Sequence, residues 1–520
     1  MKRWMTAGVR LMFLGLAMAS PALSQSSQTF YVKAKLSPDN EVNPPAGLVG
    51  LNATGSSRAR ITVNRDAGGT ITSGVVIFDV AYQFPGAITL TGFHIHSGAF
   101  DANGPVVINS GLSGTPDTDG TGSLSFTTPT LTTAAQLAAL TGLVATPHLY
   151  YINLHTSDFP GGAIRGQCTS ETFFYKATML PSNEVPAVTL NASASVLVTL
   201  DVTRDSSGSI TSGAIMFDVN YQFPGAVTFS GFHIHTGVAG VNGPVVLDTR
   251  TTGIVDATGT GRLTRIISLD TTQPRLDALK AVIANPSGHY INLHTTANPG
   301  GAVRAQLSDA HQFTSIPSVL DDATFRSNLG IQNLTNMAST VVVNVAGETG
   351  AGSEMTVALP PRGFVQLLSV NSLFGVGARG VVHLDPDQHV TAFVSTIENA
   401  TNIPFIIPLN SKGTRLGIAA VSNLGGRYVS SLVVSNEGRS AATVDILARD
   451  STGTLSGQLL GVSIPVGGFF YRANILTALG IPDGYGPLEI RSTNGQLISA
   501  QSFVVSGSAN RGAVMPGTDF

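Results

Sequence analysis

Six of the 11 histidines in this chain lie in segments whose spacing suits metal binding. Residues 92–96 read Gly-Phe-His-Ile-His, and the same five residues recur at 231–235. In a β-strand, side chains at i and i+2 point to the same face, so His94 and His96 would lie together with Ile95 on the opposite face. A His-X-His pair on a strand is therefore a chelating pair that needs no distortion of the backbone.

A third imidazole per copy comes from a second repeated segment, Tyr-Ile-Asn-Leu-His-Thr, at residues 151–156 and 290–295. If the two segments form neighbouring strands, three rings converge in each copy. The two candidate sets are His94, His96 and His155, and His233, His235 and His294. Neutral imidazoles suit zinc or copper, with metal–nitrogen distances of ~2.0–2.1 Å. The six histidines are therefore candidate ligands for copper or zinc.

A structural role is the alternative for the same histidines. Buried imidazoles commonly hydrogen-bond to backbone carbonyls or to carboxylates, and Asp79 and Asp218 are available partners at matched positions. In that case the rings would stabilise the sheet and would hold no ion. Both interpretations stay open on the sequence.

The elements that must position these rings belong to a duplicated unit of strands and turns. Residues 82–87, for example, recur at 221–226. Runs rich in β-branched and aromatic residues alternate with Gly, Pro and Asp clusters, which is typical of short strands. One short helix is expected in each copy. Thr133 precedes the helix of the first copy and Thr272 precedes that of the second, at the position that caps a helix N-terminus. We predict an all-β chain of tandem antiparallel β-sandwich or barrel domains, with one short helix in each of the first two.

The second half of the chain holds a fainter duplication, in which residues 329–333 resemble 432–436. It indicates two further β-sandwiches, which we expect to act as spacers or surface-interaction modules. The predicted domains are residues 25–169, 170–309, 310–413 and 414–520, after a signal peptide at residues 1–24.

The N-terminus has the features of an export signal. Lys2, Arg3 and Arg10 supply positive charge, an apolar run shorter than a membrane span follows, and small residues precede Gln25. We therefore expect a secreted protein, extracellular or periplasmic, with no transmembrane segment after signal removal. Loss of the three cations moves the formal net charge from −3 to −6, which excludes the basic excess of a nucleic-acid-binding protein. The single cysteine, Cys168, rules out an intrachain disulfide and is expected to be a small buried side chain.

Other repeated residues are expected to have structural roles. The Asn-Gly-Pro and Pro-Gly-Gly segments are predicted turns. Arg165 and Arg304 follow the Pro-Gly-Gly turns, and we expect each to pair with a carboxylate of its own copy, with Glu41 or Asp79 in the first and with Glu184 or Asp218 in the second. The isolated residues His311, His383 and His389 are expected at the surface.

The repeated motifs together resemble the CHRD domain, the module named after chordin. The resemblance rests on Gly-Phe-His-Ile-His, Asn-Gly-Pro-Val, Tyr-Ile-Asn-Leu-His-Thr and Pro-Gly-Gly-Ala-Ile/Val-Arg, and it covers residues 29–169 and 171–308. It implies all-β domains in secreted proteins. In chordin these domains belong to an antagonist of extracellular growth factors, but the cysteine-rich modules that accompany them there cannot exist in a chain with one cysteine.

A weaker likeness is to the copper strand of Cu/Zn superoxide dismutase, which is also a Gly-X-His-X-His strand in an all-β fold. This resemblance would make His94, His96 and His155 copper ligands. The chain departs from that family because it has no recognisable bridging histidine with zinc ligands and no disulfide.

These observations favour a secreted, non-enzymatic binding or adhesion protein whose extracellular partner is unknown and whose first two domains bind a metal ion. A copper-dependent, dismutase-like metalloenzyme and a purely structural extracellular repeat protein are the alternatives. The sequence contains no recognisable catalytic triad motif or phosphate-binding loop.

Overall fold

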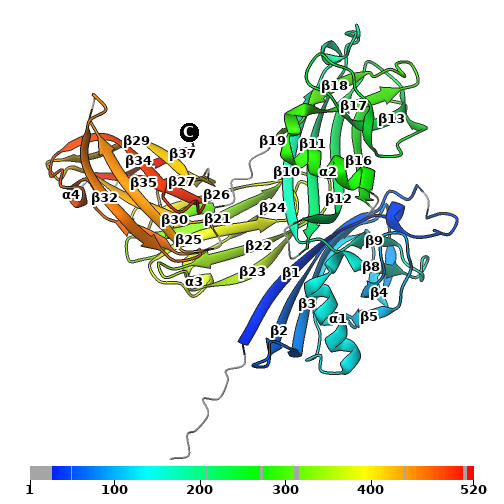
Figure 1. Ribbon diagram of the computed structural model, residues 1–520, viewed down its shortest axis with the longest axis horizontal. Coiled ribbons are helices and arrows are strands. Elements are labelled where there is room, and N and C mark those ends of the chain that lie inside the picture. Colours follow the sequence, from blue (N-terminus) through cyan, green and yellow to red (C-terminus); the bar gives the residue numbers. More distant parts are fainter. Residues whose placement is uncertain are drawn as a thin grey trace, which may run out of the picture.

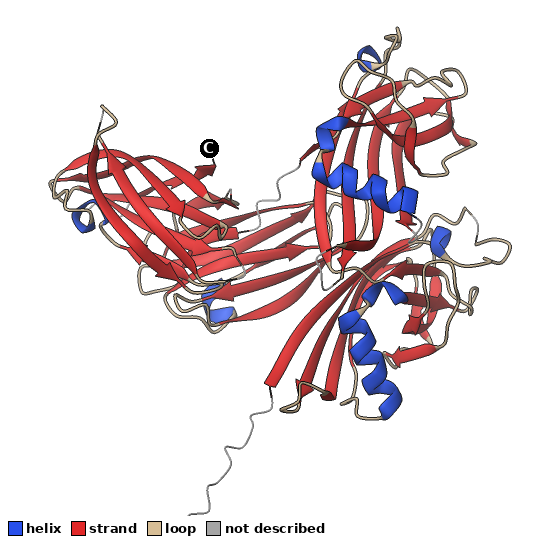
Figure 2. Cartoon of the chain, viewed as in Figure 1, coloured by secondary structure: helices blue, strands red, loops and turns tan. Residues whose placement is uncertain are grey.

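The computed structural model describes most of the chain after the predicted signal peptide. The described residues are 26–48, 50–205, 209–269, 273–309, 315–410, 412–438, 440–450, 452–506 and 512–519. This part of the chain is all-β, as predicted, and its named strands pair in antiparallel ladders (Figure 2). No helix among these residues is long and apolar enough to cross a membrane.

The first unit is a sandwich of two sheets closed by one helix. Its strands are β1 (Ser26–Leu36), β2 (Thr54–Arg65), β3 (Ile71–Gln83), β4 (Ile88–Ser97), β5 (Val106–Asn109), β6 (Thr115–Asp117), β7 (Thr121–Thr127), β8 (Tyr150–Thr156) and β9 (Ile164–Gln167). One sheet has the order β1-β2-β3-β7, and the other has the order β5-β4-β8-β9 with β6 also paired to β4. Phe78 and Phe93 meet between the sheets with ring centroids 5.4 Å apart, and both are fully buried.

Helix α1 (Ala134–Ala145) forms where the sequence predicts it. Thr133 accepts a hydrogen bond from the backbone N–H of Gln136, whose side chain accepts one from the backbone of Thr133, so a capping box fixes the start of the helix. Leu140 and Leu143 are buried in the sandwich core. Two 3-10 turns complete the unit, η1 (Pro38–Asn40) and η2 (Pro147–Leu149).

The second unit repeats this arrangement. Its elements are β10 (Glu171–Met179), η3 (Pro181–Asn183), β11 (Ser193–Arg204), β12 (Ile210–Gln222), β13 (Val227–Thr236), β14 (Val245–Asp248), β15 (Ile254–Asp256), β16 (Thr260–Leu269), α2 (Gln273–Ala284), η4 (Pro286–Gly288), β17 (His289–Thr295), β18 (Val303–Gln306) and β19 (Ser308–Asp309). The sheets have the orders β16-β12-β11-β10-β19 and β14-β13-β17-β18, with β15 paired to β13. The predicted cap Thr272 lies outside the described residues.

The third unit is a smaller sandwich. Its elements are β20 (Ser315–Leu320), β21 (Phe325–Asn333), β22 (Ser339–Ala346), β23 (Gly352–Leu359), β24 (Phe364–Leu367), α3 (Val370–Leu373), β25 (Arg379–Pro386), β26 (Val390–Glu398) and β27 (Pro404–Pro408). The sheet orders are β20-β25-β22-β23 and β24-β21-β26-β27, around a core rich in Val, Ile and Leu.

In the fourth unit the strands form one continuous ten-stranded sheet around its own core. Its elements are β28 (Lys412–Gly413), β29 (Arg415–Leu424), β30 (Tyr428–Asn436), β31 (Ala442–Arg449), β32 (Leu455–Ile464), β33 (Phe469–Arg472), α4 (Ile475–Ala478), β34 (Gly484–Ser492), β35 (Ile498–Ser506), β36 (Gly512–Pro516) and β37 (Thr518–Asp519). The resemblance between residues 329–333 and 432–436 reflects equivalent strands, β21 and β30.

The third unit lies between the fourth unit and the first two, and it packs against both of the latter (Figure 1). Arg58 Nη1 of the first unit is 2.6 Å from Asp385 Oδ2 of the third. Asp218 of the second unit accepts hydrogen bonds from the backbone and side chain of Asn336, at 3.0 and 2.6 Å. The third unit therefore packs against both of the first two units, and its role as a spacer or surface-interaction module stays a prediction.

The prediction that the isolated histidines lie at the surface was wrong for the two that the structure describes. His389 is 2% exposed, and its Nε2 lies 3.0 Å from the carbonyl oxygen of Val198 in the second unit. His383 is partly buried, with Nδ1 3.1 Å from a carboxylate oxygen of Glu437 in the fourth unit. His389 joins the third unit to the second, and His383 joins it to the fourth, which their local sequence does not reveal. His311 lies outside the described residues.

Candidate metal centres

The two histidine segments of each copy form neighbouring strands. In the first unit β4 pairs with β8, and His96 lies opposite Tyr151 while Gly92 lies opposite His155. The second unit repeats this register between β13 and β17. Phe93 points into the sandwich core and is fully buried, so the imidazoles occupy the other face of the sheet, as the alternation predicts.

Steric crowding explains why each Gly-Phe-His-Ile-His segment begins with glycine. A Cβ atom on Gly92 would lie 2.6 Å from Cε1 of His94, and one on Gly231 would lie 2.6 Å from Cε1 of His233. A side chain at this position would therefore displace the first ring of the set.

The structure brings the three predicted residues of each set together. One nitrogen from each of His94, His96 and His155 lies within 4.8 Å of the other two, and the same holds for the set at His233, His235 and His294. In the first unit the ring centroids are 4.9 to 5.6 Å apart. Bonds of ~2.0–2.1 Å to one ion can bridge this spacing with small ring rotations.

Hydrogen bonds to backbone carbonyls select the tautomer of two rings per set. Nδ1 of His96 is 3.0 Å from the carbonyl oxygen of Gly104, and Nδ1 of His155 is 3.0 Å from that of Pro160. A carbonyl oxygen only accepts, so each Nδ1 carries the proton and each Nε2 keeps a free lone pair. These Nε2 atoms, and Nδ1 of His94, are buried and have no hydrogen-bond partner.

The second set repeats these contacts. Nδ1 of His235 is 3.0 Å from the carbonyl oxygen of Gly243, and Nδ1 of His294 is 3.0 Å from that of Pro299. The Nε2 atoms of both rings and Nδ1 of His233 are again buried without a partner. In each set one Nδ1 and two Nε2 atoms are therefore buried without a partner, and one nitrogen of each ring lies within 4.8 Å of the other two.

The local electrostatics keep the rings in the form that binds metals. Burial, with smaller contributions from the neighbouring rings of His155 and His96, lowers the pKa of His94 to about 4. Burial likewise lowers the pKa of His96 and of His155, and the pKa values of the second set shift in the same direction. The imidazoles are neutral at pH 7, as a ligand must be.

A stack of side chains supports the second histidine of each set. The ring of Tyr151 lies parallel to that of His96, with centroids 4.7 Å apart, and Cζ of Arg165 lies 3.5 Å from the tyrosine centroid. In the second unit Arg304, Tyr290 and His235 form the same stack. Such contacts fix ring orientation before any ligand binds.

The expected ion pairs of the two arginines do not form. Arg165 instead donates to the side chain of Asn103 at 3.0 Å and to the backbone carbonyls of Ala99, Phe100 and Ala102. Arg304 binds the side chain of Asn242 and the loop carbonyls of its own unit in the same way. Both arginines are 1% exposed. Their hydrogen bonds hold the loop that supplies the carbonyl acceptor for His96 in the first unit and for His235 in the second.

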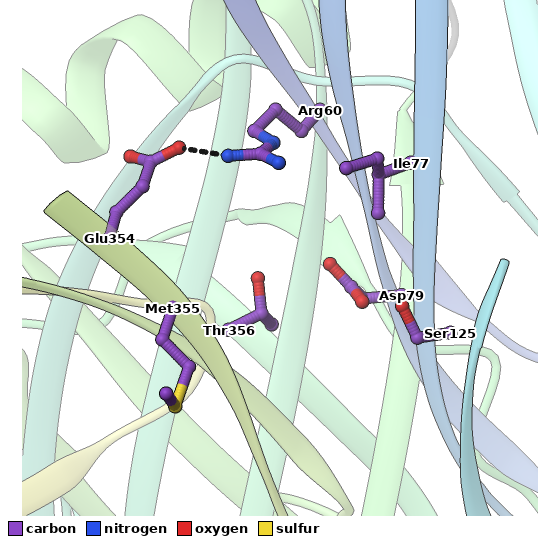
Figure 3. A pocket seen from close by; sticks show the side chains of 7 residues that line it. All are labelled: Arg60, Ile77, Asp79, Ser125, Glu354, Met355 and Thr356. Atoms are coloured by element: carbon purple, nitrogen blue, oxygen red, sulfur yellow. Dashed lines mark hydrogen bonds and ion pairs between the residues drawn. The ribbon is translucent and has the colours of Figure 1, made fainter. Parts of the chain in front are cut away.

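The carboxylates considered as partners for a structural histidine cluster lie elsewhere. Asp218 binds Asn336 of the third unit. Asp79 lines a cleft of about 240 Å³ between the first and third units, together with Arg60, Ile77, Ser125, Glu354, Met355 and Thr356 (Figure 3). In that cleft Arg60 Nη1 is 2.7 Å from Glu354 Oε1, so the pair joins the two units (Figure 3).

Sequence reasoning missed the residues around the rings. Tyr151, the Gly104 carbonyl and the Pro160 carbonyl were assigned to strands and turns with no role at the site. Their signal was present, because Tyr290, Gly243 and Pro299 recur at the spacing that separates the histidines. Glu41 was also missed as a titrating group: burial raises the pKa of Glu41 to about 7, while Arg165 acts in the opposite direction.

The fold and the sites define a protein with two tandem β-sandwiches, each with a three-histidine cluster. The CHRD domain family matches residues 32–168 and 175–307, which together are more than half of the 520 residues. The chain therefore belongs to the CHRD domain family, as its motifs predicted, and CHRD domains occur in extracellular proteins. No curated protein matches the chain.

Proposed function

We propose that this chain is a secreted, non-enzymatic binding protein whose first and second units each hold one copper or zinc ion. The ligands are Nδ1 of the first histidine and Nε2 of the other two. These residues are His94, His96 and His155 in the first unit and His233, His235 and His294 in the second.

The observation that carries this proposal is the set of buried nitrogens without partners. A buried polar atom left without a partner costs about 1–3 kcal/mol, and each unit has three such nitrogens, one on each ring of its histidine set. Two of the three rings donate their other nitrogen to a backbone carbonyl, which is the usual arrangement around a ligating imidazole. A single cation with a vacant shell would satisfy all three atoms at once.

Metal content of the purified mature protein tests the proposal. After dialysis against zinc or copper and removal of excess ion, we expect two ions per chain by elemental analysis. His96→Ala and His235→Ala should each lose one ion, and the double variant should lose both. His148→Ala is the control, because His148 is a partly buried histidine of the first unit outside either set. An ion content that the His96 and His235 substitutions leave unchanged contradicts the assignment.

A metalloenzyme is the second candidate, and one observation favours it. Three protein ligands leave a coordination position for a small molecule, as in catalytic zinc and copper sites. Dismutation of superoxide by the copper-loaded protein, abolished in His96→Ala and His235→Ala, would establish this function. Copper-loaded protein without turnover leaves the binding function. If the protein takes up no ion and its histidine variants lose only stability, the chain is a purely structural repeat protein.

Export is part of the proposal. Residues 1–24 are proposed to be a cleaved signal peptide, and CHRD domains occur in extracellular proteins. Intact mass of protein recovered from the periplasm or the medium should correspond to a chain that begins at Gln25. A mass that includes Met1 contradicts cleavage.

A further inference from the structure

The two histidine sets differ in one residue beside the first histidine. In the second unit Asp248 lies opposite His233 across β13 and β14, and in the first unit Asn109 lies opposite His94 across β4 and β5. Oδ1 of Asp248 is 3.4 Å from Nε2 of His233. The two sites therefore share their ligands but differ by one carboxylate.

The same local turn holds both residues in place. Oδ1 of Asn109 accepts a hydrogen bond from the backbone N–H of Gly111 at 2.8 Å, and Oδ1 of Asp248 accepts one from the backbone N–H of Arg250 at 2.7 Å. Asn and Asp have nearly the same shape, and their positions are fixed by equivalent contacts. The difference between the sites is thus a difference in charge.

The charge of Asp248 acts on a bound ion through the imidazole of His233. Nδ1 of His233 is the buried nitrogen without a partner, so an ion held there leaves the ring proton on Nε2, which faces the carboxylate. A carboxylate that accepts this proton orients the ring and makes it a more basic ligand, and such partners typically change metal affinity by about 10–100-fold. Asp248 has a side chain 53% exposed, so water screens its charge and the effect belongs at the lower end of this range.

We propose that Asp248 is a positioning residue that makes the second unit the tighter of two unequal metal sites. This inference rests on the proposed function, because it needs both histidine sets to bind. It predicts that a chain offered less than one equivalent of metal fills the second unit first.

Competition between the full-length apoprotein and a chromophoric zinc chelator measures both affinities. The His96→Ala variant isolates the second site, and His235→Ala isolates the first. We expect the second site to bind Zn²⁺ about 10-fold more tightly. In the His96→Ala background, Asp248→Asn should remove that advantage. In the His235→Ala background, Asn109→Asp should raise the affinity of the first site by a similar factor.

The outcomes separate this inference from the proposal beneath it. If neither site binds zinc or copper, the proposed function itself fails. If both bind with equal affinity, or if Asp248→Asn leaves the second site unchanged, only the inequality is overturned. Both substitutions keep an oxygen that accepts from the turn N–H, so the melting temperature of the apoprotein should not change. A weaker site accompanied by a lower apoprotein melting temperature would mean that Asp248 acts on the fold, which also overturns the inference.

Discussion

Substitution of Asp387 by Asn should weaken the junction between the third unit and the first. Asp387 is fully buried, and its carboxylate accepts hydrogen bonds from Ser56 of the first unit and from Ser339 and Thr340 of the third. Its backbone carbonyl accepts one from Lys35 Nζ. The change keeps the shape of the side chain and removes one negative charge.

The charge balance of this junction sets the expected magnitude. The junction contains three cations and three carboxylates, Lys33, Lys35, Arg58, Asp201, Asp385 and Asp387. Burial opposes ionisation of Asp387, but Lys35 and Arg58 hold its pKa below the usual range, so the carboxylate is charged at pH 7. Breaking a buried ionic group typically costs ~3–5 kcal/mol. We expect the lower end, about 3 kcal/mol, because solvent reaches Asp385, whose side chain is 54% exposed.

Differential scanning calorimetry of the full-length protein measures this cost. At roughly 4–8 °C per kcal/mol for a domain of about 100 residues, such as the third unit, the transition that includes the junction should fall by roughly 12–24 °C. Asp277→Asn is the matched control, since Asp277 is 65% exposed on α2 and lies 3.9 Å from Lys280. That surface pair is worth less than about 1 kcal/mol. An Asp387→Asn protein with the same melting temperature as the wild type would refute the view that these charges hold the units together.

Four further predictions concern the first unit. Because burial holds the pKa of His94 at about 4, bound metal should be retained at pH 5.5 and released as the pH falls toward 4, as elemental analysis after stepwise dialysis will show. A metal-release midpoint at pH 6.5 would refute this expectation. The same lowered pKa means that the folded apoprotein binds fewer protons than the unfolded chain between pH 6.5 and 4, so this contribution to stability is complete above pH 6.5 and is lost across that window. An apoprotein whose melting temperature stays constant between pH 6.5 and 4 would contradict it. Arg165→Met removes the donors that hold residues 99–102, and amide hydrogen exchange in that loop should accelerate by at least about 10-fold, against an unchanged rate in the equivalent loop of the second unit. Cys168 is fully buried and burial raises the pKa of its thiol, so it should react with a thiol reagent only after denaturation; rapid reaction in the native protein would contradict its buried position.

Local patterns in the sequence predicted much of the site. The alternation in residues 92–96 places Phe93 in the core and His94 and His96 on the opposite face, because strand geometry leaves no other arrangement. The cap at Thr133 and the burial of Cys168 are confirmed for similar reasons, since each depends on short-range geometry or on a simple apolar preference.

The partners of charged residues could not be predicted in the same way. Arg165 has carboxylates in its own unit, yet it binds the loop carbonyls between residues 99 and 102. His389 of the third unit contacts Val198 of the second, and Asp218 of the second unit contacts Asn336 of the third. Such choices depend on which surfaces meet after the sandwiches form, and a single sequence does not record those contacts.

The sequence by itself determined the duplication, the antiparallel all-β class and the strand faces that carry the two histidine sets. Only the tertiary structure decided which nitrogen each ring presents, because the carbonyls of Gly104 and Pro160 reach His96 and His155 from loops whose paths the strand pattern does not fix. It also decided that the third unit closes over buried charges of the first two. A strand repeat is a local property of the chain, whereas a tautomer and an interface are set by atoms that only folding brings together.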